Sequence, residues 1–258
     1  MEKIVPISDN SVAWITGAGT GIGLAGAQDL AQGGALVILS GRRAEVVEAE
    51  AEKIKQAGAR AEAIALDVAD AAAVGRVAAD ILARHGRIDI LVNSAGLNST
   101  NRFWKDQTVA GWNEVLGINL NGSYYTIAAV LPSMRERREG LIINISSWAG
   151  RFDTYMTGPA YNASKHAVVA LTASLNMEEC ANGIRACAIC PGEVATPIMK
   201  KRPVPPTEQE MAQMLQAEDL GRTIRFVAEM PAHVCINKIL ISPTWNRIYI
   251  GGADIARR

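Results

Sequence analysis

The sequence predicts an α/β fold with a doubly wound parallel sheet of about seven strands and helices on both faces. Two observations lead to this prediction. Short apolar runs alternate with longer helical stretches along the 258 residues, and parallel strands require such crossover helices. The runs are almost continuously apolar, as burial of both faces of a sheet demands. We expect one domain over residues 1–258.

The individual elements follow from the apolar periodicity and from the glycines and prolines between the runs. We expect strands at residues 12–16, 36–40, 61–66, 88–92, 141–145, 184–190 and 236–241. We expect helices at residues 22–32, 44–57, 71–84, 109–137 and 160–181. A segment at 198–216 that contains three prolines interrupts this alternation. Its position suits a mobile substrate lid.

Composition excludes several function classes. The chain carries 26 basic and 26 acidic residues, so it offers no broad electrostatic field for nucleic acid or an anionic membrane. Glycines break the first apolar run, which fits neither a signal peptide nor a membrane span. Cys187 and Cys190 fall in one expected strand and face opposite sides, which favours structural thiols over a metal or redox site. We expect a cytoplasmic protein without a metal centre.

The first expected strand leads into a glycine-rich turn that opens a helix, a setting in which backbone amides bind a pyrophosphate. Gly17, Gly21 and Gly23 have the spacing G-x-x-x-G-x-G. The second strand is followed by Arg42 and Arg43, with no carboxylate at its end. Two guanidiniums can bind a ribose 2′-phosphate, so we favour NADP(H) over NAD(H). The alternative is that both arginines only solvate a loop.

Tyr161 and Lys165 stand four residues apart in an expected helix, which brings both side chains onto one face. A cation about 4 Å from a phenol, at an effective dielectric of about 20, favours the phenolate by about 4 kcal/mol. This attraction would lower the tyrosine pKa by roughly three units, toward the range of a general acid/base at neutral pH. The spacing also arises by chance, so its weight depends on the surrounding motifs.

Several further motifs share one register with this pair, at residues 16–23, 67–68, 93–96, 117–120, 146–147 and 191–197. With them the chain resembles the short-chain dehydrogenase/reductase family over most of its length, which implies a Rossmann-type fold. Ser94 departs from the family pattern, which has asparagine there. The resemblance implies an NADP(H)-dependent enzyme that interconverts a secondary alcohol and a carbonyl compound by hydride transfer. The alternative is a non-catalytic NADPH-binding sensor or scaffold with the same fold.

The resemblance also implies residue roles. Tyr161 would exchange the proton, Lys165 would lower its pKa and hold the nicotinamide ribose, and Ser147 would hydrogen-bond the developing alkoxide. Asn119 would position a water that joins Lys165 to solvent. The implied cofactor-binding residues are Gly17, Thr20, Gly21, Ile22, Gly23, Arg42, Arg43, Asp67, Val68, Asn93, Ala95, Gly96, Tyr161, Lys165, Pro191, Gly192, Val194 and Thr196.

Three assignments have alternatives. The family pattern favours Ser147 as the catalytic serine, and Ser146 is the alternative. Glu193 stands where the family often has an apolar residue; it could contact a polar substrate, but we expect it to point to solvent. The basic run at residues 200–202 could attract an anionic substrate, but we interpret it as a solvated charge run.

The residues expected around the substrate are mostly apolar, which indicates a carbonyl compound with a hydrophobic body. The same residues fit a subunit interface or lid packing equally well. They are Leu97, Asn98, Trp148, Phe152, Tyr155, Ile198, Met199, Met211 and Met214. By resemblance we expect a homotetramer or homodimer formed through the helices at 109–137 and 160–181.

Overall fold

A seven-stranded sheet runs through the centre of the protein. The structure, a computed structural model, describes residues 7–249. The strand order is β3-β2-β1-β4-β5-β6-β7, and all neighbouring pairs are parallel, which confirms the predicted fold class. The strands are β1 (Val12–Thr16), β2 (Leu36–Gly41), β3 (Ala61–Ala65), β4 (Ile90–Asn93), β5 (Gly140–Ile145), β6 (Ile184–Pro191) and β7 (Lys238–Ile241).

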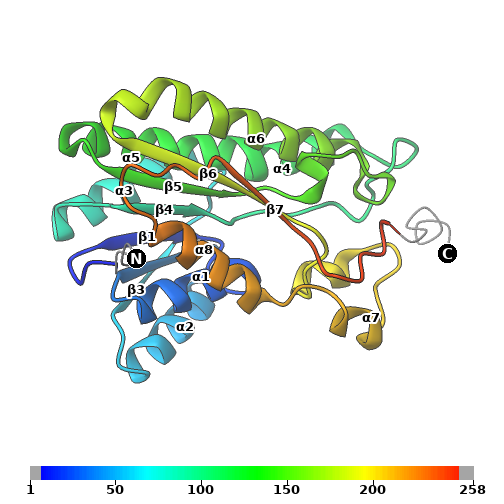
Figure 1. Cartoon of the computed structure of the whole chain (residues 1–258). Coiled ribbons are helices and arrows are strands. Elements are labelled where there is room, and N and C mark those ends of the chain that lie inside the picture. Colours follow the sequence, from blue (N-terminus) through cyan, green and yellow to red (C-terminus); the bar gives the residue numbers. More distant parts are fainter. Residues whose placement is uncertain (1–6, 250–258) are drawn as a thin grey trace.

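Helices cover both faces of this sheet (Figure 1). One layer holds α1, α2 and α8, and the opposite layer holds α3 to α6. Within residues 7–249, no helix combines the length and the apolar composition that a membrane crossing requires. The helices are α1 (Gly21–Gln32), α2 (Ala44–Gln56), α3 (Ala71–His85), α4 (Val109–Leu116), α5 (Gly122–Arg137), α6 (Gly158–Glu179), α7 (Glu208–Ala212) and α8 (Ala217–Ala228).

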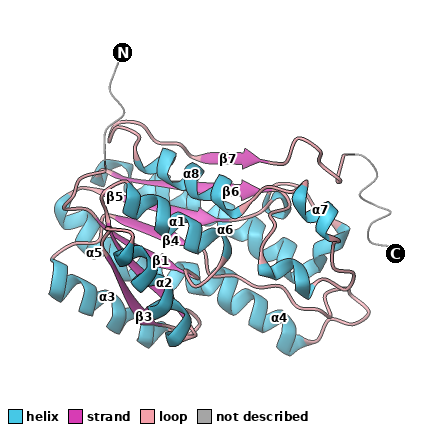
Figure 2. Cartoon of the chain, turned by 90° about the horizontal axis from the view of Figure 1, so that it is seen from below, coloured by secondary structure: helices cyan, strands magenta, loops and turns pink. Residues whose placement is uncertain are grey.

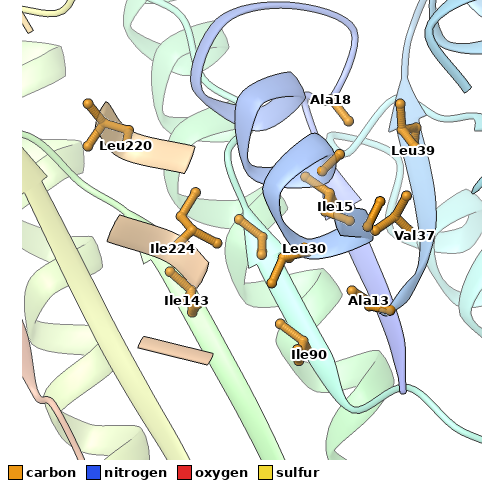
Figure 3. Close-up of a cluster of buried hydrophobic side chains, with 14 of the residues drawn as sticks. Ala13, Ile15, Ala18, Leu30, Val37, Leu39, Ile90, Ile143, Leu220 and Ile224 are labelled. Atoms are coloured by element: carbon orange, nitrogen blue, oxygen red, sulfur yellow. The ribbon is translucent and has the colours of Figure 1, made fainter. Parts of the chain in front are cut away.

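The alternation of side chains along β1 divides the core between the two layers. Ala13 and Ile15 pack in the cluster that contains Leu30 of α1 and Ile224 of α8 (Figure 3). Trp14, between them, points to the opposite cluster, which contains the α3 and α5 side chains. All five residues of β1 are buried, so the strand packs against side chains on both faces of the sheet.

The helix predicted over residues 109–137 has a defect near its middle. Its residues form α4 and α5, joined by a π-helical turn at Gly117–Asn121. A π turn accommodates one additional residue by an i→i+5 hydrogen bond, and such turns occur often at functional sites. Apolar periodicity over nearly thirty residues does not reveal one slipped turn, because the pattern on either side remains helical.

The segment at residues 198–216, predicted to be a lid, lies beyond the carboxyl end of the sheet. It contains a 3₁₀ helix at Pro197–Lys201 and the short helix α7. The arrows of β6 and β7 point toward α7 (Figure 2). A bridge between Val194 and Leu215 ties the two ends of the segment together. The two ends of this segment therefore lie side by side, and the residues between them lie beyond the strand ends.

Candidate active site

A long cavity of about 280 Å³ follows the carboxyl edge of the sheet. Its walls come from the turns after β1, β2, β3, β4, β5 and β6 and from the start of α6. In an open α/β sheet, ligands bind outside the carboxyl ends of the strands, where the strand order reverses. Here the order reverses at β1, whose neighbours are β2 and β4.

The turn after β1 lines one wall of this cavity. Gly17 and Gly21 have φ values of 66° and 59°, a region that residues with a Cβ rarely adopt. A Cβ on Gly21 would lie 3.1 Å from the methyl carbon of Thr196, so the missing side chain lets the turn approach the strand-six loop closely. The turn then opens α1, whose first backbone N–H groups have no intrahelical partner.

Most of the residues predicted to bind the cofactor line this cavity. They are Gly17, Thr20, Gly21, Ile22, Arg42, Asp67, Val68, Ala95, Gly96, Tyr161, Lys165, Pro191, Gly192, Val194 and Thr196. Three predicted residues do not line it. Gly23 packs against the Gly17 carbonyl, Arg43 is exposed at the start of α2, and Asn93 is buried with hydrogen bonds to Asn144 and Thr126.

Tyr161 and Lys165 lie in the first turns of α6, as predicted. Lys165 is buried, and its Nζ donates a 2.8 Å hydrogen bond to the Ile145 carbonyl at the end of β5. The same Nζ lies 5.6 Å from the centroid of the Tyr161 ring. Tyr161 is half-buried and lines the cavity together with Ser147. The phenol, the ammonium and a serine hydroxyl therefore converge at one end of the cavity.

The pKa of Tyr161 does not move in the direction predicted from its spacing to Lys165. Burial raises the pKa of the phenol, and Ser147, Arg202 and Arg102 oppose this shift only in part. Burial also lowers the pKa of Lys165 to about 8. The expected fall of three units is therefore wrong for this structure, because desolvation of the phenol outweighs the attraction of nearby cations.

The two candidate serines after β5 have different surroundings. Ser146 is buried, and its hydroxyl donates to the Lys165 carbonyl at 2.9 Å. Ser147 is half-buried, begins the next 3₁₀ turn and interacts with the Tyr161 hydroxyl. Ser146 thus holds the backbone of α6, whereas Ser147 is the serine beside the phenol.

Asn119 lies in the π-helical turn and is completely buried. Its side-chain oxygen accepts the Leu97 amide at 2.8 Å, and its nitrogen donates to the Leu97 carbonyl and to the Ser164 hydroxyl. Both N–H groups of the amide are thereby used within the protein. Asn119 does not line the cavity, and its side chain holds the segment after β4 in place.

A second, smaller cavity of about 90 Å³ adjoins the first. The two share Ser147 and Tyr161 as lining residues, so the hydroxyl pair faces both cavities. Of the predicted substrate-wall residues, Leu97 lines the long cavity, Asn98 and Trp148 line the small one, and Ile198 and Met199 line both. The remaining four predicted wall residues line neither cavity: Phe152, Tyr155, Met211 and Met214.

Glu193 does not point to solvent, contrary to the prediction. It is buried, lines the small cavity and pairs with Arg202 and Arg247, whose nitrogens lie 2.5 Å and 2.7 Å from its Oε1. Burial opposes its ionisation, but the two guanidiniums hold the pKa of the carboxyl below its usual range. Arg202 is likewise not part of a solvated run, since its side chain is only 15% exposed.

The sequence did not indicate that Arg102 and Arg247 would lie at the small cavity. Arg102 lines this cavity and is buried, and Arg247 reaches the Glu193 carboxylate from near the end of the described chain. Neither residue stands in a recognisable motif. Single basic residues in irregular segments carry no periodic signal, so only the folded chain reveals where they meet.

These features define a class of doubly wound α/β proteins. In this class a glycine-rich turn and a tyrosine-lysine pair lie together at the carboxyl edge of the sheet. Residues 11–205 match the family described as short chain dehydrogenase. A Streptomyces virginiae protein named "Monensin polyketide synthase putative ketoacyl reductase" is 41% identical over 196 residues, which cover 75% of this chain and 74% of that protein. The chain therefore belongs to the short-chain dehydrogenase family.

Solved structures agree with this membership. A metagenomic short-chain oxidoreductase in complex with NADP superposes with a TM-score of 0.80 at 31% identity, covering 93% of this chain and 100% of that one. A serine dehydrogenase complexed with NADP⁺ gives a TM-score of 0.82 at 32% identity, covering 90% and 94%. These two structures thus share most of the described fold with this chain.

Proposed function

We propose that the protein is an NADP(H)-dependent oxidoreductase that interconverts a secondary alcohol and a carbonyl compound. One observation carries the proposal: Ser147 and Tyr161 stand on the wall shared by the long cavity and the small one. A cofactor in the long cavity and a substrate in the small cavity would then meet at these two hydroxyls. The NADP-bound relatives support the choice of a nicotinamide cofactor.

The residues along the long cavity fit such a cofactor. The unpaired N–H groups at the start of α1 suit a pyrophosphate. Arg42 is exposed at the far end of the cavity, and no ion pair joins it to an acid among residues 7–249, so its guanidinium is available for a ribose 2′-phosphate. When bound, NADP(H) supplies or accepts the hydride.

The protein's own residues handle the proton. In reduction the Tyr161 hydroxyl donates a proton to the carbonyl oxygen, while the Ser147 hydroxyl donates a hydrogen bond to the same oxygen as charge develops. In oxidation the reverse transfer starts from the Tyr161 phenolate, which accepts the alcohol proton. Because burial raises the pKa of Tyr161, the phenol stays protonated at neutral pH, which favours its role as the proton donor in reduction. The hydrogen bond from Lys165 to the Ile145 carbonyl joins α6 to the end of β5 beside these two hydroxyls.

Substitution of Tyr161 by phenylalanine tests the proposal. We expect Tyr161→Phe to lower kcat by at least about 10²-fold, because a positioned general acid contributes about 10²–10⁴-fold. The affinity for NADPH, measured by fluorescence titration, should stay within a few-fold. Tyr155→Phe is the matched control, since Tyr155 is exposed and lines neither cavity. Turnover in Tyr161→Phe equal to wild type, on carbonyl compounds followed at the nicotinamide absorbance, would refute the assignment.

Two predictions about the wider molecule belong with this function. We propose that residues 198–216 close over bound substrate, supported by their place beyond the strand ends and by Met199 in both cavities.

We also propose a homotetramer or homodimer through α4, α5 and α6, supported by exposed apolar side chains on these helices, among them Val109, Tyr124 and Met177. Light scattering of the purified protein tests the second proposal, and a monomer at all concentrations would contradict it.

A further inference from the structure

Arg102 is a buried cation without a carboxylate partner among the described residues. It lies in the irregular segment between β4 and α4, and the residue is 4% exposed. Its printed hydrogen bonds all go to backbone carbonyls: Nε to Ser99 at 2.8 Å, one terminal nitrogen to Met156 at 3.5 Å and the other to Lys201 at 2.8 Å. A buried charge is usually paired with an opposite charge, so Arg102 is an exception that needs a reason.

The neighbouring charges do not compensate Arg102, because they compensate one another. Glu193 pairs with Arg202 and Arg247, and Arg247 also pairs with Glu210 at 2.6 Å. These two carboxylates and two guanidiniums sum to zero, which leaves the charge of Arg102 in excess. Burial and then the positive charge of Arg202 lower the pKa of Arg102 to about 10, as expected for a cation that faces another cation.

The uncompensated guanidinium also has hydrogen-bonding capacity left. An arginine side chain carries five N–H groups, and the three carbonyl bonds of Arg102 leave two of them without an acceptor among the described residues. Arg102 lines the small cavity together with Tyr161 and Ser147. A planar, charged fork with free donors beside a proposed reaction centre matches a carboxylate.

We propose that the small cavity binds the carboxylate of a compact hydroxy acid or keto acid, with Arg102 as its counter-ion and with the reacting oxygen at Ser147 and Tyr161. This inference rests on the proposed function. The small cavity measures about 90 Å³, well below the volume of about 300 Å³ at which drug-sized ligand sites begin, so only a short substrate portion fits there. Glu193 remains held by its two arginines and leaves Arg102 free for the substrate.

Matched acid and ester substrates test this proposal. The probes are 3-hydroxybutyrate and lactate with their methyl esters, oxidised with NADP⁺. We expect wild type to have a KM at least tenfold lower for at least one acid than for its ester. Arg102→Met should raise the KM for that acid at least tenfold and bring the acid-to-ester ratio close to one. Arg102→Lys keeps the charge but loses the planar fork, so it should retain part of the preference.

A merely structural role for Arg102 predicts a different result. If Arg102 only joined the three backbone segments, its substitution would weaken acid and ester equally, and this outcome would overturn the proposal. Equal use of acids and esters by wild type would also overturn it, even if Arg102→Met did not fold. Lys200→Met is the control, because it removes an exposed positive charge from the same neighbourhood and should leave the acid preference unchanged.

A binding measurement separates this proposal from the proposed function. Calorimetric titration of the NADP⁺-loaded protein with the same four compounds requires no turnover. Saturable binding of an acid that is lost in Arg102→Met, in a protein that oxidises none of the compounds and reduces no carbonyl compound, would overturn the oxidoreductase proposal and keep the carboxylate site. Carbonyl reduction without any binding preference for the acids would do the reverse.

Discussion

The two cavities at the carboxyl edge of the sheet are built in different ways. The long cavity is formed by turns that directly follow parallel strands, and its wall includes five glycines and the small side chain of Ala95 among larger residues; the glycines are Gly17, Gly21, Gly41, Gly96 and Gly192. The small cavity is formed by irregular segments, and its wall includes the charged residues Arg102, Glu193 and Arg202. The first cavity takes its shape from the sheet, whereas the second depends on ion pairs between distant segments.

This difference determines what each region tolerates. Strand ends are fixed by the core on both sides, so the long cavity should keep its shape when single polar side chains are replaced. The small cavity is held by Glu193, which joins Arg202 nine residues away to Arg247 fifty-four residues away. Removal of one charge from such a buried group leaves the others uncompensated. The predictions below compare the two regions, from the largest expected effect to the smallest.

The largest effect is expected in the small cavity, from Glu193→Gln. Loss of this carboxylate leaves Arg202 without a carboxylate partner and Arg247 with Glu210 alone, and breaking a buried ion pair costs about 3–5 kcal/mol. We expect a fall in Tm of roughly 10 °C by calorimetry. Glu208→Gln is the control: Glu208 is exposed at the start of α7 and makes no ion pair among the described residues, so its loss should cost less than about 1 kcal/mol. An unchanged Tm in Glu193→Gln would contradict the compensation of charges described above.

A smaller effect is expected at the far end of the long cavity. Arg42→Ala should weaken NADPH binding about tenfold, about 1.4 kcal/mol, and leave NADH binding unchanged, because only NADPH carries the 2′-phosphate. Arg43→Ala is the matched control, since Arg43 is an exposed neighbour outside the cavity. A wild type that prefers NADH, or equal losses in both variants, would refute the role of Arg42. The Tm of each variant should stay close to that of wild type.

The last effect, which is smaller per pH unit than the effect of Arg42→Ala, concerns the pH dependence of stability at Lys165. Its pKa falls from 10.5 to about 8 on burial, so between these values the unfolded chain binds more protons than the native state. Stability due to this group therefore rises with pH across that interval, by less than about 1.4 kcal/mol per pH unit. Wild type minus Lys165→Met, compared by urea unfolding at pH 7.5, 8.5 and 9.5, should show this rise. A difference independent of pH would contradict the buried, pKa-shifted ammonium.

The long cavity, where we propose that the cofactor binds, could be predicted from the sequence because its signals are local. Gly17 and Gly21 follow a strand directly, and the i and i+4 positions of Tyr161 and Lys165 define one helix face. Their placement in the structure matches these expectations. Gly23, Arg43 and Asn93 were predicted to bind the cofactor but lie outside the cavity. Each is next in sequence to a lining residue, and spacing alone does not tell which of two neighbours faces the cavity.

The small cavity, where we propose that the substrate binds, could not be predicted, for a physical reason. The surroundings of Glu193 depend on Arg202 and Arg247, and nothing in the sequence between them indicates that these residues meet. The pKa of Tyr161 was predicted from one nearby cation, whereas desolvation of the phenol is the larger influence. Both errors come from treating a residue by its sequence neighbours when its energy depends on burial in the folded chain.

The two hydrogen bonds from the Asn119 side chain to Leu97 have the pattern of backbone pairing in a β-sheet. Its carboxamide accepts from the Leu97 amide and donates to the Leu97 carbonyl, as a neighbouring β-strand would. Leu97 follows the last paired residue of β4 and has no strand beside it there. Asn119 lies in the π-helical turn. Its side chain therefore pairs with the Leu97 backbone beyond Asn93, where the pairing of β4 with β5 ends. The backbone leading to the small cavity therefore has an anchor that an aspartate, which lacks the N–H donors, could not replace.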